Sequence, residues 1–203
     1  MEERMFFEYG QEEICYLMKK DKRLAEWIET IGPIQREVIP DLFEALINSI
    51  AGQQISSKAL QTVWRRMKEC FGGITPDKIE GCPLEYLQSF GLSGRKAGYM
   101  KGAAKAVING ELDLVQLRKL SDDEVCRELV RLKGIGIWTA EMLLIFSLQR
   151  KDVFSYGDFG IRKGLQNIYH HKEITKERFE RYRKRYSPYG SIASLYLWEA
   201  AKR

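Results

Sequence analysis

The sequence is poor in the residues that build metal centres and disulfide frameworks. Its 203 residues include four widely spaced cysteines: Cys15, Cys70, Cys82 and Cys126. None of them belongs to a CxxC pair, which argues against a structural zinc site and against a cysteine-ligated iron–sulfur cluster. His170 and His171 are adjacent, and on a predicted helix neighbouring side chains would point apart, so we do not expect them to bind a metal. Reduced thiols in a cytosolic protein are the expected state.

A long hydrophobic run is also absent. No stretch approaches the roughly 20 apolar residues that a membrane span needs. The N-terminus, MEERMFFEYG, carries acidic residues early and holds no apolar run of signal-peptide length. We therefore expect a cytoplasmic protein with no membrane partner.

The overall charge is too small to identify a partner. Lysine and arginine outnumber aspartate and glutamate by 33 to 28, which gives a net charge of +5. A polyanionic partner is compatible with this value, but many soluble proteins carry as much charge. With 44% hydrophobic and 30% charged residues, the chain has the composition of an ordinary globular protein.

The alternation of polar and apolar residues that predicts β-strands is nearly absent. The segment KDVFSYG comes closest and is too short to found a sheet. Apolar residues instead recur at helical spacing, as in DKRLAEWIETI and DLFEALINSIAGQQ. Ser121 followed by Glu124 is a capping-box pattern at the start of another helix. The sequence therefore predicts an all-α protein that forms a single unit over residues 1–203.

The segment LKGIGIWTA, residues 132–140, stands between two strongly periodic helices. Gly134 and Gly136 allow a tight turn, and the helix that follows has unpaired amides and a positive dipole end. This arrangement is suited to binding a phosphate. As a bare GxG, however, the pair is better explained as a helix–helix turn whose glycines serve packing.

The complete string changes that balance, because it resembles the LPGIGxxTA hairpin of the helix-hairpin-helix DNA glycosylase superfamily. Asp158, in VFSYGDFGIRKG, follows Gly136 by 22 residues, a spacing similar to that in the 3-methyladenine DNA glycosylase II type. KDVF at 151–154 and RYSPYGSIASLYLW also resemble this type, so the likeness extends from about Asp41 onward. Lys133 stands where the family usually has proline.

The resemblance implies a two-lobed helical fold with its active-site cleft between the lobes. Lobe one would combine residues from about 1–49 with 153–203, and lobe two would span about 50–152, with the helix-hairpin-helix at about 121–150. The implied activity is monofunctional base-excision repair of alkylated purines such as 3-methyladenine, on damaged double-stranded DNA and as a monomer. The alternatives are a glycosylase for another damaged or mismatched base, and a noncatalytic DNA-binding module.

Asp158 is the predicted catalytic residue. Cleavage of an N-glycosidic bond builds positive charge on the sugar, which a fixed carboxylate stabilises. An alkylated purine is already cationic and leaves without a general acid, so one carboxylate suffices. Asp158 also suits the N-cap of the helix that follows, and the two roles are compatible. Bifunctional relatives carry a lysine where this chain has Trp138, which implies a monofunctional enzyme.

The resemblance implies further site residues. The expected pocket-lining residues, for which core packing is the alternative, are Trp138, Met142, Phe159 and Trp198. In GQQIS, Gln54 matches the family residue that fills the gap left by a flipped base. The alternative interpretation of Gln53 and Gln54 is a polar helix end. The expected DNA-binding residues are Gln53, Gln54, Ser56, Arg95, Lys96, Lys133, Gly134, Gly136, Thr139, Arg162 and Lys163. No cofactor is expected to be required, but a Na⁺ or K⁺ ion would be held by the main-chain carbonyls of Val130, Leu132 and Ile135.

The run from Lys172 to Arg185 is rich in charges of both signs. A solvated helix face explains such a run better than a recognition tail does.

Overall fold

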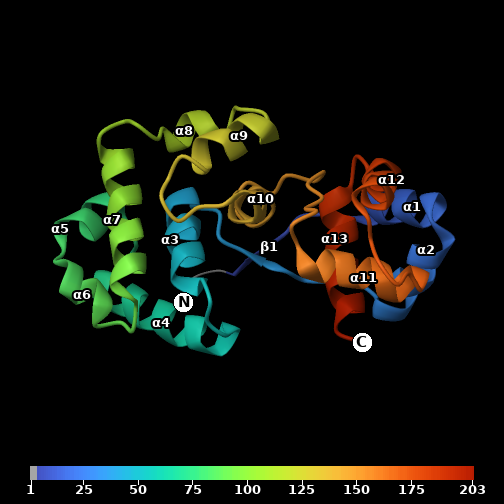
Figure 1. Ribbon diagram of the computed structural model, residues 1–203, viewed down its shortest axis with the longest axis horizontal. Helices are drawn as coiled ribbons and strands as arrows, with labels where there is room; N and C mark the ends of the chain where they lie inside the picture. The colour runs from blue at the N-terminus through green and yellow to red at the C-terminus, as the bar shows by residue number, and fades with distance from the viewer. Residues whose placement is uncertain (1–3) are drawn as a thin grey trace. The chain divides into compact units, whose positions relative to one another are not determined.

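The computed structural model describes residues 4–203, which form thirteen helices and one small antiparallel sheet (Figure 1). The sheet pairs β1 (Met5–Phe6) with β2 (Glu37–Val38), and Met5 lies opposite Val38. The all-α prediction is confirmed, because each strand has two residues and every larger element is a helix. Within residues 4–203, no helix has the length and apolar character needed to cross a membrane.

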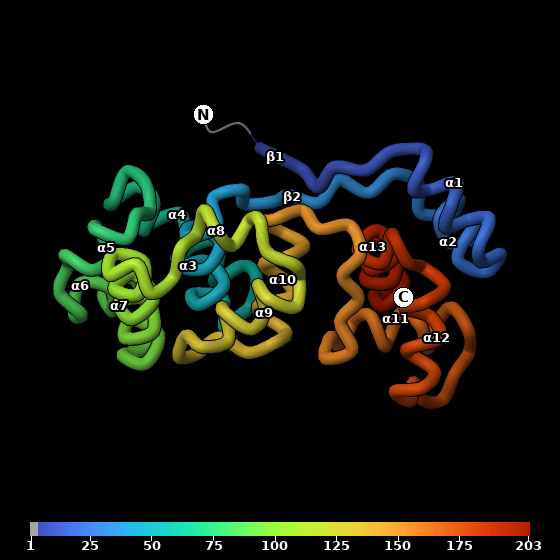
Figure 2. Tube along the Cα trace, turned by 90° about the horizontal axis from the view of Figure 1, so that it is seen from above, coloured from blue at the N-terminus to red at the C-terminus, as the bar shows by residue number. Residues whose placement is uncertain are grey.

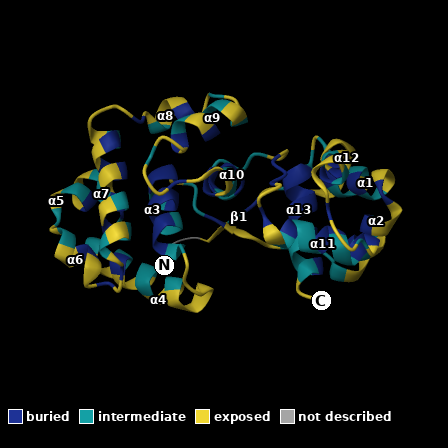
Figure 3. Ribbon diagram, in the orientation of Figure 1, coloured by how far each residue is buried: buried dark blue, intermediate teal, exposed yellow. Residues whose placement is uncertain are grey.

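The chain divides into two compact units. Unit 1 combines the chain up to Val38 with Leu144–Arg203. Its helices are α1 (Gln11–Lys20), α2 (Lys22–Ile31), α11 (Phe159–Tyr169), α12 (Lys176–Tyr186) and α13 (Gly190–Ala201). Helix α13 is the centre of this unit: residues from Gly190 to Leu197 are buried on every side (Figure 3), and α11 packs along it. A helix that is apolar all round is expected to be enclosed in this way.

Unit 2 is Ile39–Leu143. Its helices are α3 (Leu42–Gly52), α4 (Ser57–Phe71), α5 (Pro76–Gly81), α6 (Leu84–Gln88), α7 (Gly94–Ile108), α8 (Leu114–Leu117) and α9 (Asp122–Leu129). Helix α10 (Ile137–Phe146) starts in unit 2 and ends in unit 1. Helices α3, α5 and α6 all pack against α7, which Figure 2 shows from above.

The boundaries between the units differ from those predicted for the lobes. The first lies after Val38 rather than near residue 49, and the second lies after Leu143 rather than near residue 152. The first difference arises because α3 packs against α4 and α7, so the whole helix belongs with unit 2. The pattern of α3 marks its apolar face but does not show which helices cover that face.

Local helix signals in the sequence are confirmed. The Asp41 side chain accepts a hydrogen bond from the Glu44 backbone N–H at 2.7 Å, as an N-cap does. The predicted capping box at α9 is complete, since Ser121 accepts from the Glu124 N–H and the Glu124 carboxylate accepts from the Ser121 N–H at 2.9 Å. Capping interactions of this kind depend on residues three apart, which is why a local pattern suffices to predict them.

Candidate functional site

Asp158 lies at the N-terminus of α11, in unit 1. Its Oδ1 accepts two hydrogen bonds, from the Ile161 backbone N–H at 2.8 Å and from the Trp198 indole N–H at 2.9 Å. The residue is 6% exposed. The positive end of the helix dipole and the two donors favour a negatively charged side chain at this place. The position therefore holds a carboxylate in one fixed orientation, and the predicted N-cap role of Asp158 is confirmed.

Trp198 contacts this carboxylate with the edge of its ring. The ring packs against Phe146, with centroids 5.5 Å apart, and the Arg36 guanidinium lies 6.0 Å from the Trp198 ring centroid. A Cβ atom at Gly160 would lie 2.7 Å from Trp198 Cδ1. Glycine at this position therefore leaves the room that the indole occupies. Trp198 is predicted from the sequence to line the pocket, and in the structure its indole also orients Asp158.

Two aromatic residues next to Asp158 face solvent. Phe159 is 72% exposed, although it directly follows a buried residue. Tyr156 is also exposed, packs edge-on against Phe179, and has the Arg162 guanidinium 5.3 Å from its ring centroid. An exposed phenylalanine beside a fixed carboxylate is suited to stacking on a planar ligand. Tyr156 was not predicted from the sequence. Its aromatic side chain, two positions before Asp158, was the signal that could have identified it.

The other predicted pocket residues belong to α10 in unit 2. Trp138 is 48% exposed, and Met142 lies one turn further along the helix and is half-buried. Thr139, between them, is buried. The first turn of α10 therefore presents a large aromatic ring to solvent, whereas the rest of the helix is mostly enclosed.

The turn between α9 and α10 has the geometry of a tight hairpin. Gly134 has a φ of +88°, a left-handed conformation that favours glycine. A Cβ atom there would lie 2.2 Å from the ring of Tyr99, so the backbone passes directly over that ring. Gly136 and Lys133 are exposed, and Gly136 has open space where a side chain would be. The hairpin therefore exposes its backbone and the ammonium of Lys133 to solvent, next to the N-terminus of α10.

The loop after α3 connects to this hairpin. The Gln53 side-chain amide donates a hydrogen bond to the Gly134 carbonyl at 2.8 Å. Gln54 is exposed and has a φ of +55°, which is uncommon and mildly strained for a residue other than glycine. Ser56 caps α4 by accepting from the Ala59 N–H at 3.2 Å. Gln54 therefore combines an exposed side chain with an uncommon backbone conformation in the loop between α3 and α4.

The predicted basic DNA-binding residues differ in their surroundings. Lys96 donates to the Ala51 carbonyl at 2.9 Å, and burial lowers the pKa of its ammonium, so it links α7 to α3. Arg95 is exposed instead and lines an open pocket of about 520 Å³ beside the hairpin, together with Arg131 and Lys133. Arg162 and Lys163 follow Asp158 in α11 and are half-buried.

The predicted cation site consists of backbone carbonyls. Leu132 O already accepts a hydrogen bond from the Ile135 N–H at 3.1 Å, which leaves this carbonyl one lone pair for an ion. Within residues 4–203, no group of three or more histidine, cysteine, aspartate or glutamate residues is arranged to hold a metal. The monovalent cation at Val130, Leu132 and Ile135 stays a prediction.

The two hairpin glycines should respond differently to substitution. In Gly134→Ala the new methyl group would overlap the Tyr99 ring, and the backbone has a positive φ there, so the hairpin must shift. In Gly136→Ala the new methyl group has no atom within 4 Å. We expect Gly134→Ala to weaken DNA binding about 10-fold or more on every sequence alike, because phosphate contacts carry no sequence information. Gly136→Ala should weaken it by a smaller factor. Fluorescence anisotropy with two unrelated duplexes measures both effects, and equal losses in the two variants would contradict this account of the hairpin.

Comparison with known proteins places these features in a family. The family model described as "HhH-GPD superfamily base excision DNA repair protein" matches residues 47–188. DNA-3-methyladenine glycosylase 1 of Schizosaccharomyces pombe is 33% identical over 186 residues, which cover 89% of this chain and 82% of that protein. The putative DNA-3-methyladenine glycosylase YfjP of Bacillus subtilis is 27% identical and is covered over 58% of its length.

Solved structures give the same result. A crystal structure of DNA-3-methyladenine glycosidase from Bacillus halodurans has a TM-score of 0.83 and 35% identity, with 97% of this chain and 92% of that chain covered. The Schizosaccharomyces pombe 3-methyladenine DNA glycosylase in complex with abasic DNA has a TM-score of 0.83 and 30% identity, with 95% and 98% covered. With a matching hairpin and a family match over more than half of its length, this chain belongs to the HhH-GPD superfamily of base excision DNA repair proteins.

Proposed function

We propose that the protein is a monofunctional DNA glycosylase that hydrolyses the N-glycosidic bond of alkylated purines in duplex DNA. The observation that carries the proposal is the fixed carboxylate of Asp158, held by Ile161 and Trp198 beside the exposed ring of Phe159. The names of the relatives favour alkylated purines as the substrate class.

The mechanism needs one carboxylate. As the bond to the base lengthens, the sugar gains oxocarbenium character, and the negative charge of Asp158 stabilises it without moving, because its orientation is already set. The cationic base accepts the bonding electrons and leaves as a neutral molecule, so no second carboxyl group is needed to protonate it. Water then adds to the sugar cation and gives up a proton to the Asp158 carboxylate, which passes it to solvent, and an abasic site remains.

Aromatic residues and the hairpin supply binding. The target base has to leave the duplex, and a flipped cationic base is held well by an aromatic face such as that of Phe159. Gln54, which is exposed in the loop after α3, fills the gap in the stack. The amides of the hairpin around Gly134 and the ammonium of Lys133 bind a backbone phosphate. We further propose that the protein acts as a monomer.

A lesion panel tests the substrate class. The protein is incubated with duplexes that each carry one alkylated purine, one oxidised purine, one mismatched base or no lesion. We expect abasic sites to form in the duplex with the alkylated purine. Abasic sites in the oxidised or mismatched duplexes alone would show that the same site serves another base. Tight binding of DNA with no base release from any duplex would show a noncatalytic module.

Strand cleavage separates the monofunctional mechanism from a lyase mechanism. Strand nicking follows when an amine forms a Schiff base with the sugar, and Trp138 occupies the place where a lysine would supply that amine. We expect no borohydride-trapped complex between the protein and lesion-containing DNA. Lys133 is the nearest lysine in the sequence, so a trapped complex that disappears in Lys133→Ala would overturn the monofunctional assignment.

A further inference from the structure

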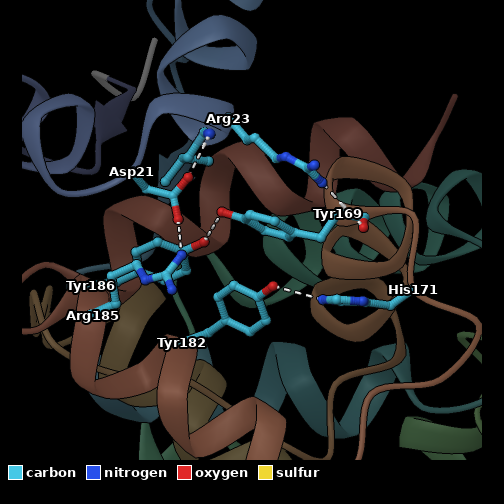
Figure 4. A network of polar contacts seen from close by, with 8 residues as sticks. Asp21, Arg23, Tyr169, His171, Tyr182, Arg185 and Tyr186 are labelled. Atoms are coloured by element: carbon cyan, nitrogen blue, oxygen red, sulfur yellow. Dashed lines mark hydrogen bonds and ion pairs between the residues drawn. The ribbon is translucent and has the colours of Figure 1, made fainter.

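An open pocket of about 510 Å³ lies in unit 1 where the start of α2 meets the ends of α11 and α12. Its lining residues are Lys20, Asp21, Lys22, Arg23, Tyr169, Tyr182 and Arg185. Four of these side chains are cationic and one is anionic. Figure 4 shows how most of them lie around a shared network of polar contacts.

The single carboxylate of the pocket is neutralised within the protein. Asp21 Oδ1 accepts a hydrogen bond from the Leu24 backbone N–H at 3.1 Å, and Oδ2 accepts one from Arg185 Nη1 at 2.5 Å. The Asp21 side chain is 3% exposed, whereas that of Arg185 is 43% exposed. The acid thus lies beneath the surface and orients the arginine, whose guanidinium has further N–H groups to offer.

The buried residues Tyr169 and Tyr182 line the base of the pocket. The hydroxyls of Tyr169 and Tyr186 are 2.6 Å apart, and the Tyr182 hydroxyl lies 2.8 Å from His171 Nε2. Burial raises the pKa of all three phenols, so they remain neutral donors and acceptors. Arg185 lies over the Tyr182 ring, 5.2 Å from its centroid. Tyr182 therefore helps to fix the place of Arg185, and the neutral phenols add no negative charge.

The remaining cations surround this base. Lys20, Lys22 and Arg23 are exposed, and none of them forms an ion pair with any residue in the described range 4–203. Arg23 instead donates to the Tyr169 carbonyl at 3.3 Å. The pKa of His171 is lowered, first by burial and then by the positive charges of Arg178, Arg23 and Arg181. Positive potential thus accumulates at this end of unit 1.

The run from Lys172 to Arg185 is part of this region. It contains seven lysine or arginine residues and three glutamates, and the sequence favoured a solvated helix face. In α12, however, Phe179, Tyr182 and Tyr186 are buried, and Arg185 turns into the pocket. Part of the run is therefore built into a defined cationic cavity.

We propose that this pocket binds a backbone phosphate of the DNA, away from the lesion; this rests on the proposed function. Helix α11 supports the choice, because Asp158 caps its first residue and Tyr169 is its last. Eleven residues rise by about 16 Å, which is the length of about five base pairs. A duplex whose damaged nucleotide is at Asp158 and which follows α11 reaches the pocket with its flanking backbone.

The test compares two double variants that each remove two positive charges. Lys20→Ala/Lys22→Ala changes the pocket, and Lys105→Ala/Lys119→Ala removes two exposed lysines from unit 2 as the matched control. Binding of an undamaged duplex is measured by anisotropy over a range of salt concentrations. We expect the pocket variant to bind several-fold more weakly and to lower the salt-dependence slope by about 0.9 for each phosphate that it no longer neutralises. The control variant should keep the wild-type slope.

The other outcomes are distinct. An unchanged slope in the pocket variant would overturn the proposal. Inorganic phosphate that raises the melting temperature of the wild type but not of the pocket variant, with DNA binding unaltered, would show a site for free anions instead. The proposal would also be overturned if the pocket variant bound an acidic protein more weakly than the wild type does but bound DNA equally well. The assay uses undamaged DNA, so its result is independent of base release, and a failure of the proposed glycosylase activity is recognised separately in the lesion panel.

Discussion

Asp158→Asn is expected to lower the single-turnover rate of base release by about 10²-fold or more, with little change in DNA binding or in melting temperature. The loss follows from removal of the negative charge that stabilises the developing sugar cation, since loss of one such electrostatic interaction typically costs about 10² to 10³ in rate. Asparagine has the same shape as aspartate. Its side-chain oxygen can still accept from the Ile161 N–H and the Trp198 indole, so the cap of α11 is kept.

Asp152→Asn is the matched control. Asp152 is also in unit 1, where its carboxylate accepts from the Gly190 backbone N–H at 3.1 Å and from the Ser187 hydroxyl at 2.6 Å. This variant loses the same charge next to a helix start and should release base at close to the wild-type rate. A rate of base release in Asp158→Asn equal to that in Asp152→Asn would remove the catalytic assignment of Asp158.

Gly164→Ala is expected to destabilise unit 1 by about 1 to 3 kcal/mol, which lowers the melting temperature by several degrees. Gly164 faces α13, and a Cβ atom there would lie 2.2 Å from the Leu197 carbonyl oxygen and 2.8 Å from the Leu197 Cα. These are backbone atoms at the centre of the unit, so the two helices have to move apart. Because Asp158 and Trp198 lie on the two sides of this contact, base release should fall as well.

Gly98→Ala is the control for helix propensity. Gly98 is also inside a helix, α7, but has nothing within 4 Å of the place where a side chain would be. Alanine is favoured over glycine in a helix by up to about 1 kcal/mol, so this variant should melt at the same or a higher temperature. Thermal unfolding followed by circular dichroism compares the two. If Gly164→Ala were as stable as Gly98→Ala, the close packing of α11 on α13 would be contradicted.

Features set by neighbouring residues could be predicted from the sequence. The all-α class follows from helical spacing, and the cap of Asp158 on α11 depends on a residue three positions away. The hairpin was recognisable because its whole string, with Gly134 and Gly136, lies within nine consecutive residues. In these cases the pattern and the contact share the same short segment.

Contacts between distant segments were not predictable in this way. The Asp21–Arg185 ion pair joins residues 164 positions apart, and the Trp198 bond to Asp158 spans 40. Gln53 was expected to bind DNA, and its bond to the Gly134 carbonyl crosses 81 positions. Periodicity identifies the apolar face of each helix but contains no information on which helix covers it. This limit also explains why the predicted lobe boundary near residue 49 falls inside α3.

The most direct test of the central claim is the release of free base from methylated DNA. Wild-type protein is incubated with alkylated duplex DNA, the small molecules are separated by chromatography, and the strands are run on a denaturing gel with and without alkali. We expect free 3-methyladenine in the small-molecule fraction and strand breaks that appear only after alkali. Free base accompanied by breaks without alkali, or bound DNA from which no alkylated purine is released, would contradict the claim.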